Sequence, residues 1–276
     1  MSTWIFLLVL TALSLATLLF ARRWALPAER PATAPPLPGP PEAGTGLGEP
    51  AARSGADELT QLQAEVARLG GLAEAQVSAA VDSVVRRDVA AAEAVIARDD
   101  RLDAMQRDIE RRALRIIGLR QPEAQELRRA VAAMKLAQEL ERTGDLATNI
   151  AKRAVVLAAA EPMTTLTRSV ERLGRLAAHR IKDVLDAYTG ADVERALLVW
   201  SRDEEVDEHY NSLFRELLTY MMAEPRTITP CAHLLFIAKN LERIGDHATN
   251  VAEIIHYEIT GDEMAHARPR ADALSR

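Results

Sequence analysis

One motif occurs twice in this chain, and the duplication limits the fold more than any other feature of the sequence. Residues 140–151 read LERTGDLATNIA, and residues 241–252 read LERIGDHATNVA. Ten of the twelve paired positions are identical or exchange one aliphatic residue for another. Polar residues that recur 101 positions apart within amphipathic stretches predict a duplicated structural unit that carries a duplicated site.

The composition favours helices over strands. Aromatic residues make up 4% of the 276 residues, and Ala, Leu, Glu and Arg dominate the stretches between the few places rich in Gly and Pro. The net charge of −6 gives no excess of basic residues, which argues against a nucleic-acid partner. Cys231 is the only cysteine, so an intramolecular disulfide is excluded and a reducing compartment is indicated.

The first 26 residues are predicted to form a membrane anchor. Residues 4–20 are uncharged and rich in Leu, and they approach the length that spans a bilayer. Arg22 and Arg23 follow directly, and this charge asymmetry predicts a cytoplasmic body anchored to the inner face of the membrane by residues 4–26. In the alternative interpretation the start codon is mis-assigned and this segment is never made.

Residues 27–56 are rich in Pro, Ala and Gly and are predicted to be a linker. The folded body begins near residue 57 with apolar residues three and four positions apart, the period of a helix. Asp88 is predicted to cap a second helix that continues to about residue 119. The third helix follows Pro122, continues to about residue 159 and contains the first motif.

The second half repeats this plan. Helices are predicted at residues 166–188, 192–222 and 227–260, and the tail at 262–276 is predicted to be frayed. The fold class is therefore all-α, with two tandem three-helix bundles related by an internal repeat, at 57–160 and 161–261, and an N-terminal transmembrane-like helix.

The motif places several oxygen-bearing side chains in one row. On a helix, residues four apart lie on nearly the same side, and two like charges in that arrangement destabilise the helix unless a positive group lies between them. A bound cation is the best candidate for that positive group. The predicted rows are Glu141, Asp145 and Asn149 in the first copy, and Glu242, Asp246 and Asn250 in the second.

Aspartates of the second helix in each unit could face these rows and complete a cluster of ions. Oxygen donors favour hard ions such as Mg²⁺, Mn²⁺ or Fe over Zn²⁺, which prefers thiolates. The aspartates are Asp99 and Asp103 in the first unit, and Asp203 and Asp207 in the second.

Other interpretations of the motif stay open. Rows of carboxylates on helices are often solvated surfaces that bind nothing. Gly144 and Gly245 cost about 1 kcal/mol each against Ala inside a helix, so something packs close to them, either another helix or the metal-bearing edge. His247 is predicted to face solvent, because its counterpart in the first copy is Leu146.

The repeated Glu-x-x-x-Asp signature, with the Asn-aliphatic-Ala that follows it, resembles that of the PhoU family, the phosphate-specific transport system accessory proteins. Residues 119–122 (LRQP) and 210–220 (YNSLFRELLTY) also look like this family. The resemblance covers about residues 57–261. The first 56 residues depart from it, because family members typically begin near the first helix.

The resemblance implies two tandem three-helix bundles related by a pseudo-twofold, often as a homodimer. It implies multinuclear metal clusters (Fe, Mn, Mg or Zn) whose ligands are Glu141, Asp145, Glu242 and Asp246, followed by Asp103, Asp207, Asn149 and Asn250. It also implies a regulatory partner role. Under phosphate sufficiency such proteins connect the phosphate ABC transporter and its ATPase to a sensor histidine kinase, and they keep phosphate-starvation signalling off.

These features predict a metal-binding adaptor that is not an enzyme and has no catalytic residues. Two alternatives remain: a carboxylate-bridged metalloenzyme on a helical bundle, and a metal-free helical scaffold. An enzyme would need an open coordination position and an acid or base beside it. No His or Lys is repeated near the motif to serve as that group.

Overall fold

The computed structural model describes residues 48–264, with side chains from residue 57 onward. The predicted anchor at residues 1–26, most of the predicted linker and residues 265–276 of the predicted tail lie outside the described residues. None of the helices found between residues 48 and 264 is both long and apolar enough to cross a membrane.

Every regular element in this part of the chain is a helix, as predicted. The long helices of the first repeat are α2 (Gly48–Arg86) and α5 (Ala124–Leu157), and those of the second are α6 (Thr164–Gly190) and α9 (Ile228–Thr260). α2 begins inside the stretch predicted to be a linker. The shorter elements are α3 (Val89–Ile96), α4 (Asp99–Arg120), α7 (Val193–Ser201), α8 (Glu204–Ala223) and η1 (Pro225–Thr227).

The prediction of one continuous second helix in each repeat is wrong. That helix is divided into α3 and α4 in the first repeat, and into α7 and α8 in the second. The first segment of each divided helix, α3 or α7, begins at the predicted place. Asp88 accepts a hydrogen bond from the backbone N–H of Ala91 at 3.0 Å, and Asp192 accepts one from the backbone N–H of Arg195 at 2.9 Å. The local apolar period does not reveal these breaks.

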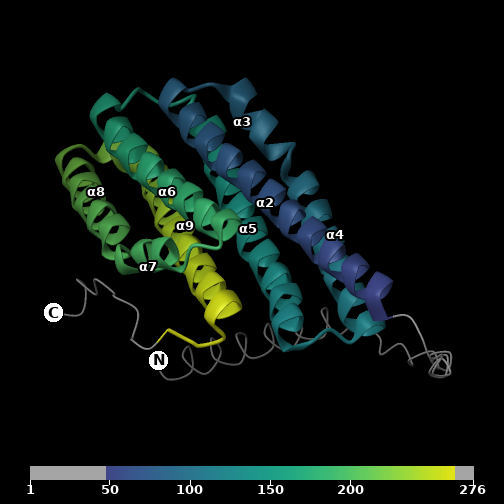
Figure 1. Cartoon of the computed structure of the whole chain (residues 1–276). Coiled ribbons are helices and arrows are strands. Elements are labelled where there is room, and N and C mark those ends of the chain that lie inside the picture. The colour runs from purple at the N-terminus through teal and green to yellow at the C-terminus, as the bar shows by residue number, and fades with distance from the viewer. Residues whose placement is uncertain (1–47, 265–276) are drawn as a thin grey trace, which may run out of the picture. The chain divides into compact units, whose positions relative to one another are not determined.

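Four long helices form the centre of the fold (Figure 1). α2 packs along α5, α5 along α9, α9 along α6 and α6 along α2, so the four helices close into a ring. The pair α3 and α4 lies against α2 and α5, and the pair α7 and α8 lies against α6 and α9. The repeats therefore meet through their long helices, and each broken helix covers the outside of its own repeat.

Two glycines let α2 and α6 approach closely where the repeats meet. A Cβ atom at Gly70 of α2 would overlap the side chain of Leu185, and one at Gly174 of α6 would lie 2.6 Å from Val81. The two glycines are 104 residues apart, as are Val81 and Leu185. Each repeat therefore gives the other the same contact, as expected for an internal pseudo-twofold relation.

One hydrophobic core continues through both repeats. Its members come mainly from the inner faces of the long helices, where Leu, Ile, Val and Ala predominate. Burying a Leu or Ile side chain fully stabilises a fold by about 1.5–3 kcal/mol. The largest fully buried side chains are Leu62, Leu69, Leu102, Ile109, Leu136, Leu140, Ile150, Leu166, Leu173, Ile181, Leu217 and Ile237.

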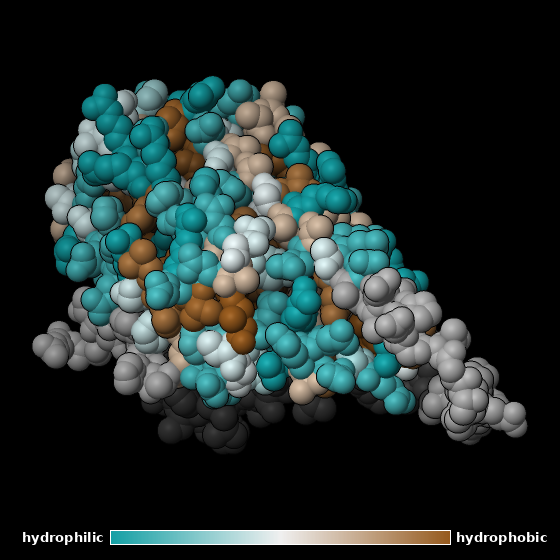
Figure 2. Space-filling model, viewed as in Figure 1, coloured by the Kyte–Doolittle hydropathy of each residue, from teal (hydrophilic) through white to brown (hydrophobic). Residues whose placement is uncertain are grey.

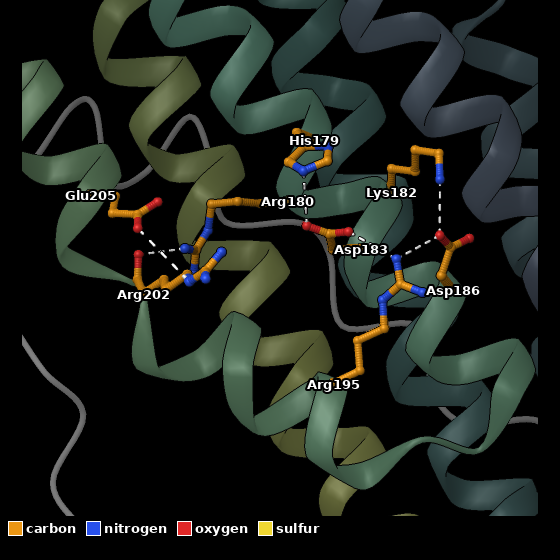
Figure 3. A network of polar contacts seen from close by, with 8 residues as sticks. All are labelled: His179, Arg180, Lys182, Asp183, Asp186, Arg195, Arg202 and Glu205. Atoms are coloured by element: carbon orange, nitrogen blue, oxygen red, sulfur yellow. Dashed lines mark hydrogen bonds and ion pairs between the residues drawn. The ribbon is translucent and has the colours of Figure 1, made fainter.

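Charged contacts hold α7 against α6 at both ends of the shorter helix (Figure 3). Near its beginning, Arg195 Nη2 lies 3.0 Å from Asp183 Oδ1. Near its end, Arg180 of α6 donates hydrogen bonds to the backbone carbonyls of Val199 and Arg202. These carbonyls lie at the break, where regular helical hydrogen bonds end. The buried guanidinium therefore stabilises the break between α7 and α8.

Hydrophilic residues cover most of the described surface in Figure 2, and apolar residues show mainly in smaller areas between them. This distribution is that of amphipathic helices, each with one apolar side turned to the core. Some apolar side chains remain exposed, among them Leu198 of α7, with 49% of its surface accessible. Single exposed apolar residues are ordinary on protein surfaces.

A buried carboxylate links the repeats near the end of α9. Glu258 is 11% exposed, and its Oε1 lies 4.0 Å from Nε of Arg129 on α5. Arg129 also donates a hydrogen bond to Gln63 of α2 at 3.3 Å. Burial raises the pKa of Glu258 to about 7, against the opposing effect of Arg129. This carboxyl group therefore titrates near neutral pH.

Replacing Glu258 by Gln is expected to stabilise the protein at alkaline pH and much less at acidic pH. The folded-state pKa of about 7 lies above the ordinary 4.5, so the stabilisation from the protonated carboxyl is complete below pH 4.5 and is lost as pH rises through 7. At pH 8, E258Q should exceed the wild type by roughly 2–4 kcal/mol in free energy of unfolding.

Urea denaturation at pH 5 and pH 8 measures this difference. Glu93→Gln, at an exposed position of α3, provides the control, because the same chemical change there should alter stability little at either pH. An E258Q effect of equal size at both pH values would contradict the buried titration.

Candidate metal centre

The first acidic row meets a carboxylate from the neighbouring helix. Glu141 and Asp145 lie one turn apart on α5, and Asp103 lies one turn into α4. One carboxylate oxygen from each residue lies within 4.8 Å of the others. Asp145 is exposed and the other two are partly buried, so the cluster opens to the surface. The structure thus brings together three of the predicted site residues.

A hydrogen-bond chain fixes α4 beside α5. Thr148 Oγ1 donates to Asp99 Oδ1 at 3.0 Å, and Gln76 Nε2 of α2 donates to Thr148 Oγ1 at 2.9 Å. Asp99 is the first residue of α4, so this hydrogen bond fixes the position of α4 along the axis of α5. Asp103, one turn later, then faces the row that contains Glu141. Asp99 itself, a candidate for that row, is engaged by Thr148 and lies outside the cluster.

The second repeat contains the same chain of hydrogen bonds, but its first donor is a charged residue. Thr249 Oγ1 donates to Asp203 Oδ1 at 2.7 Å, and Arg180 Nη2 donates to Thr249 Oγ1 at 3.0 Å. Arg180 takes the place of Gln76, which lies 104 residues earlier. Its Nη2 also lies 3.7 Å from Asp203 Oδ1, and both side chains are buried. The aspartate at the start of α8 is therefore balanced by an arginine, unlike its counterpart on α4.

The carboxylates of the first cluster are buried in part and raise one another's pKa. Burial raises the pKa of Glu141, and the charges of Asp145 and Asp103 raise it further. Burial also raises the pKa of Asp145, followed by the charges of Asp99 and Asp103. Glu141 and Asp145 form no ion pair with the residues that the structure describes, whereas Asp103 pairs with Arg107 at 3.5 Å. Crowded carboxylates of this kind favour the binding of a cation.

The second row differs because a lysine touches it. Lys239 Nζ lies 2.5 Å from Glu242 Oε1. Burial raises the pKa of Glu242, and the hydrogen bond from Lys239 opposes that rise. Burial also raises the pKa of Asp207 to about 6, with further contributions from Asp203, Glu242 and Asp246. The acidic residues of the second repeat therefore influence one another as those of the first do.

The donor atoms suit a hard cation. Both rows supply oxygen and no sulfur, which matches the preferences of Mg²⁺, Mn²⁺ and Fe. Glu242 Oε2 is buried and accepts no hydrogen bond within the described part of the chain. A buried polar atom left without a partner costs about 1–3 kcal/mol. A cation beside Glu242 would satisfy this oxygen, so the residues present fit an oxygen-bound metal.

The repeated glycines of the motif are explained by helix packing. A Cβ atom at Gly144 would overlap the side chain of Leu102 on α4, and one at Gly245 would lie 3.0 Å from Val206 on α8. Of the two explanations open from the sequence, the close contact is with another helix. This contact brings α4 and α8 near enough for their aspartates to reach the rows.

The asparagines that end the two rows have different surroundings. Asn149 is exposed on α5. Asn250 donates its Nδ2 hydrogen bond to Glu139 Oε2 of α5 at 2.8 Å, and His247 Nδ1 lies 2.7 Å from the same oxygen. The prediction that His247 faces solvent is wrong, because the residue is 12% exposed and contacts the other repeat. These contacts tie α9 to α5.

Two residues of this region were missed by the motif analysis. Although burial raises the pKa of Glu139, hydrogen bonds from His247 and Asn250 hold it below its usual value. Lys239, which contacts the second row, was likewise not predicted. Both sit just outside the duplicated residues and differ between the copies, since Glu139 pairs with Asn240 and Lys239 with Gln138. A difference between the two copies directly beside an otherwise matching motif is the sequence signal that could have identified them.

Both repeats match the same family model, that of the PhoU domain. The matches cover residues 66–154 and residues 170–255. The chain belongs to the PhoU family. The fold is accordingly PhoU-like and helical, with two PhoU domains, and the resemblance noted in the sequence is confirmed.

Close relatives are named phosphate-specific transport system accessory protein PhoU homologs. The protein of Caulobacter vibrioides (strain NA1000 / CB15N) is 61% identical over 224 residues, which are 81% of this chain and 97% of that protein. The protein of Rhizobium meliloti (strain 1021) is 47% identical over 219 residues, 79% of this chain and 92% of that protein. PhoU relatives are thus covered over nearly their whole length.

Solved structures show the same fold. The crystal structure of PhoU from Pseudomonas aeruginosa is 35% identical, with a TM-score of 0.73 over 75% of this chain and 99% of that one. The crystal structure of the phosphate transport system regulatory protein PhoU from Streptococcus pneumoniae is 26% identical, with a TM-score of 0.71 over 77% of this chain and all of that one.

Replacing Gly144 by Ala is expected to destabilise the protein, because Leu102 is 2% exposed and has no room to move away. Overpacking costs about 1–3 kcal/mol, and the better helix propensity of Ala returns about 1 kcal/mol. In a Leu102→Ala background the overlap is gone, so G144A should become stabilising. The double-mutant cycle is measured by urea denaturation in the presence of a chelator.

The matched variant Gly245→Ala meets Val206 at 3.0 Å and should be the milder of the two single substitutions. An effect of G144A that is the same with and without the Leu102 side chain would show that the glycine is not needed for this contact.

Proposed function

We propose that this chain is a metal-binding adaptor, not an enzyme, that represses phosphate uptake and phosphate-starvation signalling. In this role it connects the phosphate ABC transporter and its ATPase to a sensor histidine kinase. The proposal is supported by relatives named as accessory proteins of the phosphate-specific transport system, and by a solved relative titled a phosphate transport system regulatory protein. The observation that carries the metal-binding part is the convergence of Asp103, Glu141 and Asp145.

The proposed metal ligands are the carboxylates of both repeats. Asp103, Glu141 and Asp145 would hold the metal of the first repeat, and Asp207, Glu242 and Asp246 that of the second. Asn149 and Asn250 are proposed as additional ligands. The orphaned oxygen of Glu242 supports the second assignment. Two helices contribute to each set, so a bound ion would connect the broken outer helix of each repeat to its motif helix.

The non-catalytic part of the proposal follows from the chemistry of the donors. A metal-dependent hydrolase or oxidase needs a proton donor or acceptor poised beside an open coordination position. The three converging carboxylates of the first repeat would all serve as ligands of the cation, and no His or Lys is repeated near the motif to act as that donor or acceptor. We assign the ion to holding helices in place, where its effect is on the surface presented to partners.

Removing the first carboxylate pair should lower metal content without loss of fold. The full-length chain, purified without a metal-affinity tag, is expected to contain Mn, Fe, Mg or Zn by elemental analysis. In the double variant Glu141→Gln/Asp145→Asn, the metal of the first repeat should be lost, while helical circular dichroism stays unchanged. The exposed pair Glu93→Gln/Asp108→Asn serves as the control.

Metal at background level in the wild type, with thermal stability unchanged by added Mn²⁺, would favour the metal-free scaffold. A large loss of helical signal in the double variant would instead make the two carboxylates structural.

The proposed cellular position is beside the transporter. We propose a cytoplasmic body tethered by residues 4–26, as the sequence predicts, which would keep the protein next to the membrane proteins that it regulates. A homodimer, implied by the resemblance, would present two copies of the same surface to the transporter and the kinase.

Repression can be tested in a cell that lacks its own PhoU and carries a reporter driven by a phosphate-starvation promoter. At high phosphate the full chain should silence the reporter, and the Glu141→Gln/Asp145→Asn variant should restore a large part of its expression. A chain without residues 4–26 should repress less at equal abundance. Silencing by the double variant as complete as by the wild type would separate repression from metal binding.

A further inference from the structure

A lysine contacts the second acidic row, and the matching position of the first repeat is not a lysine. In the second repeat, Lys239 Nζ lies 2.5 Å from Glu242 Oε1 and 5.3 Å above the centre of the Tyr210 ring. Tyr210 belongs to α8, three residues after Asp207, whereas Lys239 belongs to α9. The ammonium group therefore lies between the two helices that supply the second row, held by a carboxylate and by an aromatic face.

The first repeat has no lysine beside its motif glutamate, although Arg107 of α4 pairs with Asp103 at 3.5 Å. The counterpart of Lys239 is Gln138, and the counterpart of Tyr210 is Gln106, which donates a hydrogen bond to Glu110 within α4. Lys152 and Arg142 influence Asp145 through their charge, but neither forms an ion pair with it. Among the described residues, the motif carboxylates Glu141 and Asp145 thus form no ion pair, whereas the motif carboxylate Glu242 is held by Lys239.

We propose that Lys239 is a built-in counterion that makes the two metal sites unequal. This inference rests on the proposed metal-binding function. A divalent cation reaches Glu141 and Asp145 of the first row without displacing a positive side chain, because Arg107 pairs with Asp103 alone among the three carboxylates. In the second row it must first displace the ammonium group from Glu242 Oε1, because both positive groups need the same oxygen. The sites therefore fill in order, the first repeat before the second.

The second row can still bind a cation once Lys239 moves away from Glu242. One oxygen of Glu242 is held by Lys239, while the other is buried without a hydrogen-bond partner. The side chain of Lys239 is 49% exposed, so it can swing into solvent when an ion enters. Lys239 thus determines the metal concentration at which the second repeat is occupied. The affinity of the second site for a divalent cation is lower than that of the first by about tenfold or more.

The test is a titration of the chelator-treated full-length protein with Mn²⁺ alone, followed by calorimetry and by the electron paramagnetic resonance signal of free Mn²⁺. The wild type should show a tight phase and a weak phase. Glu141→Gln should remove the tight phase, and Glu242→Gln the weak one. Lys239→Gln should tighten the weak phase by about tenfold toward the tight one.

Two further variants sharpen the result. The reciprocal change Gln138→Lys should weaken the tight phase, because it installs the ammonium group at the exposed matching position of α5. Lys239→Arg keeps the charge and should leave the weak phase nearly unchanged. An unchanged weak phase in K239Q, or two equal phases in the wild type, would overturn the role of Lys239 and leave the proposed function standing. Absence of Mn²⁺ binding by the wild type would overturn both.

Discussion

The close contact between each motif helix and its neighbour is the constraint on which the acidic rows depend. Gly144 makes room for Leu102 and Gly245 for Val206, so α4 and α8 lie near enough for an aspartate to reach the carboxylates of α5 and α9. Coulomb repulsion alone would drive these carboxylates apart. Buried apolar packing and the Asp99–Thr148 hydrogen bond hold them together, at a cost that a cation would offset.

Duplication has preserved the glycine contacts and the threonine–aspartate bond, and it has changed the charges around them. The buried threonine–aspartate bond is present in both repeats, but the residue that completes the chain is Gln76 in one and Arg180 in the other. The position three residues before the motif glutamate is likewise neutral in the first repeat, as Gln138, and positive in the second, as Lys239. Both changes place a positive side chain against an acidic residue of the second repeat, Asp203 in one case and Glu242 in the other.

The sequence predicted the helices and the residues of the first cluster because both depend on local features. Asp88 caps a helix as expected, α7 begins at the predicted place, and α4 ends at Arg120, close to the predicted end at about residue 119. The division of the second helices was not predictable, since the apolar period continues through the break. The contact of His247 with Glu139 was missed for a related reason: it joins residues 108 positions apart, across two repeats.

On the proposed function, the arrangement also links metal binding to the surface that partners would meet. α4 and α8 are outer helices, each attached to the central ring mainly along one side. On the proposed function, an ion adds ligand bonds between such a helix and its motif helix, so occupancy changes how firmly the outer surface is held. Because the first row is open and Lys239 covers the second, one chain would pass through three states of surface order as metal concentration rises.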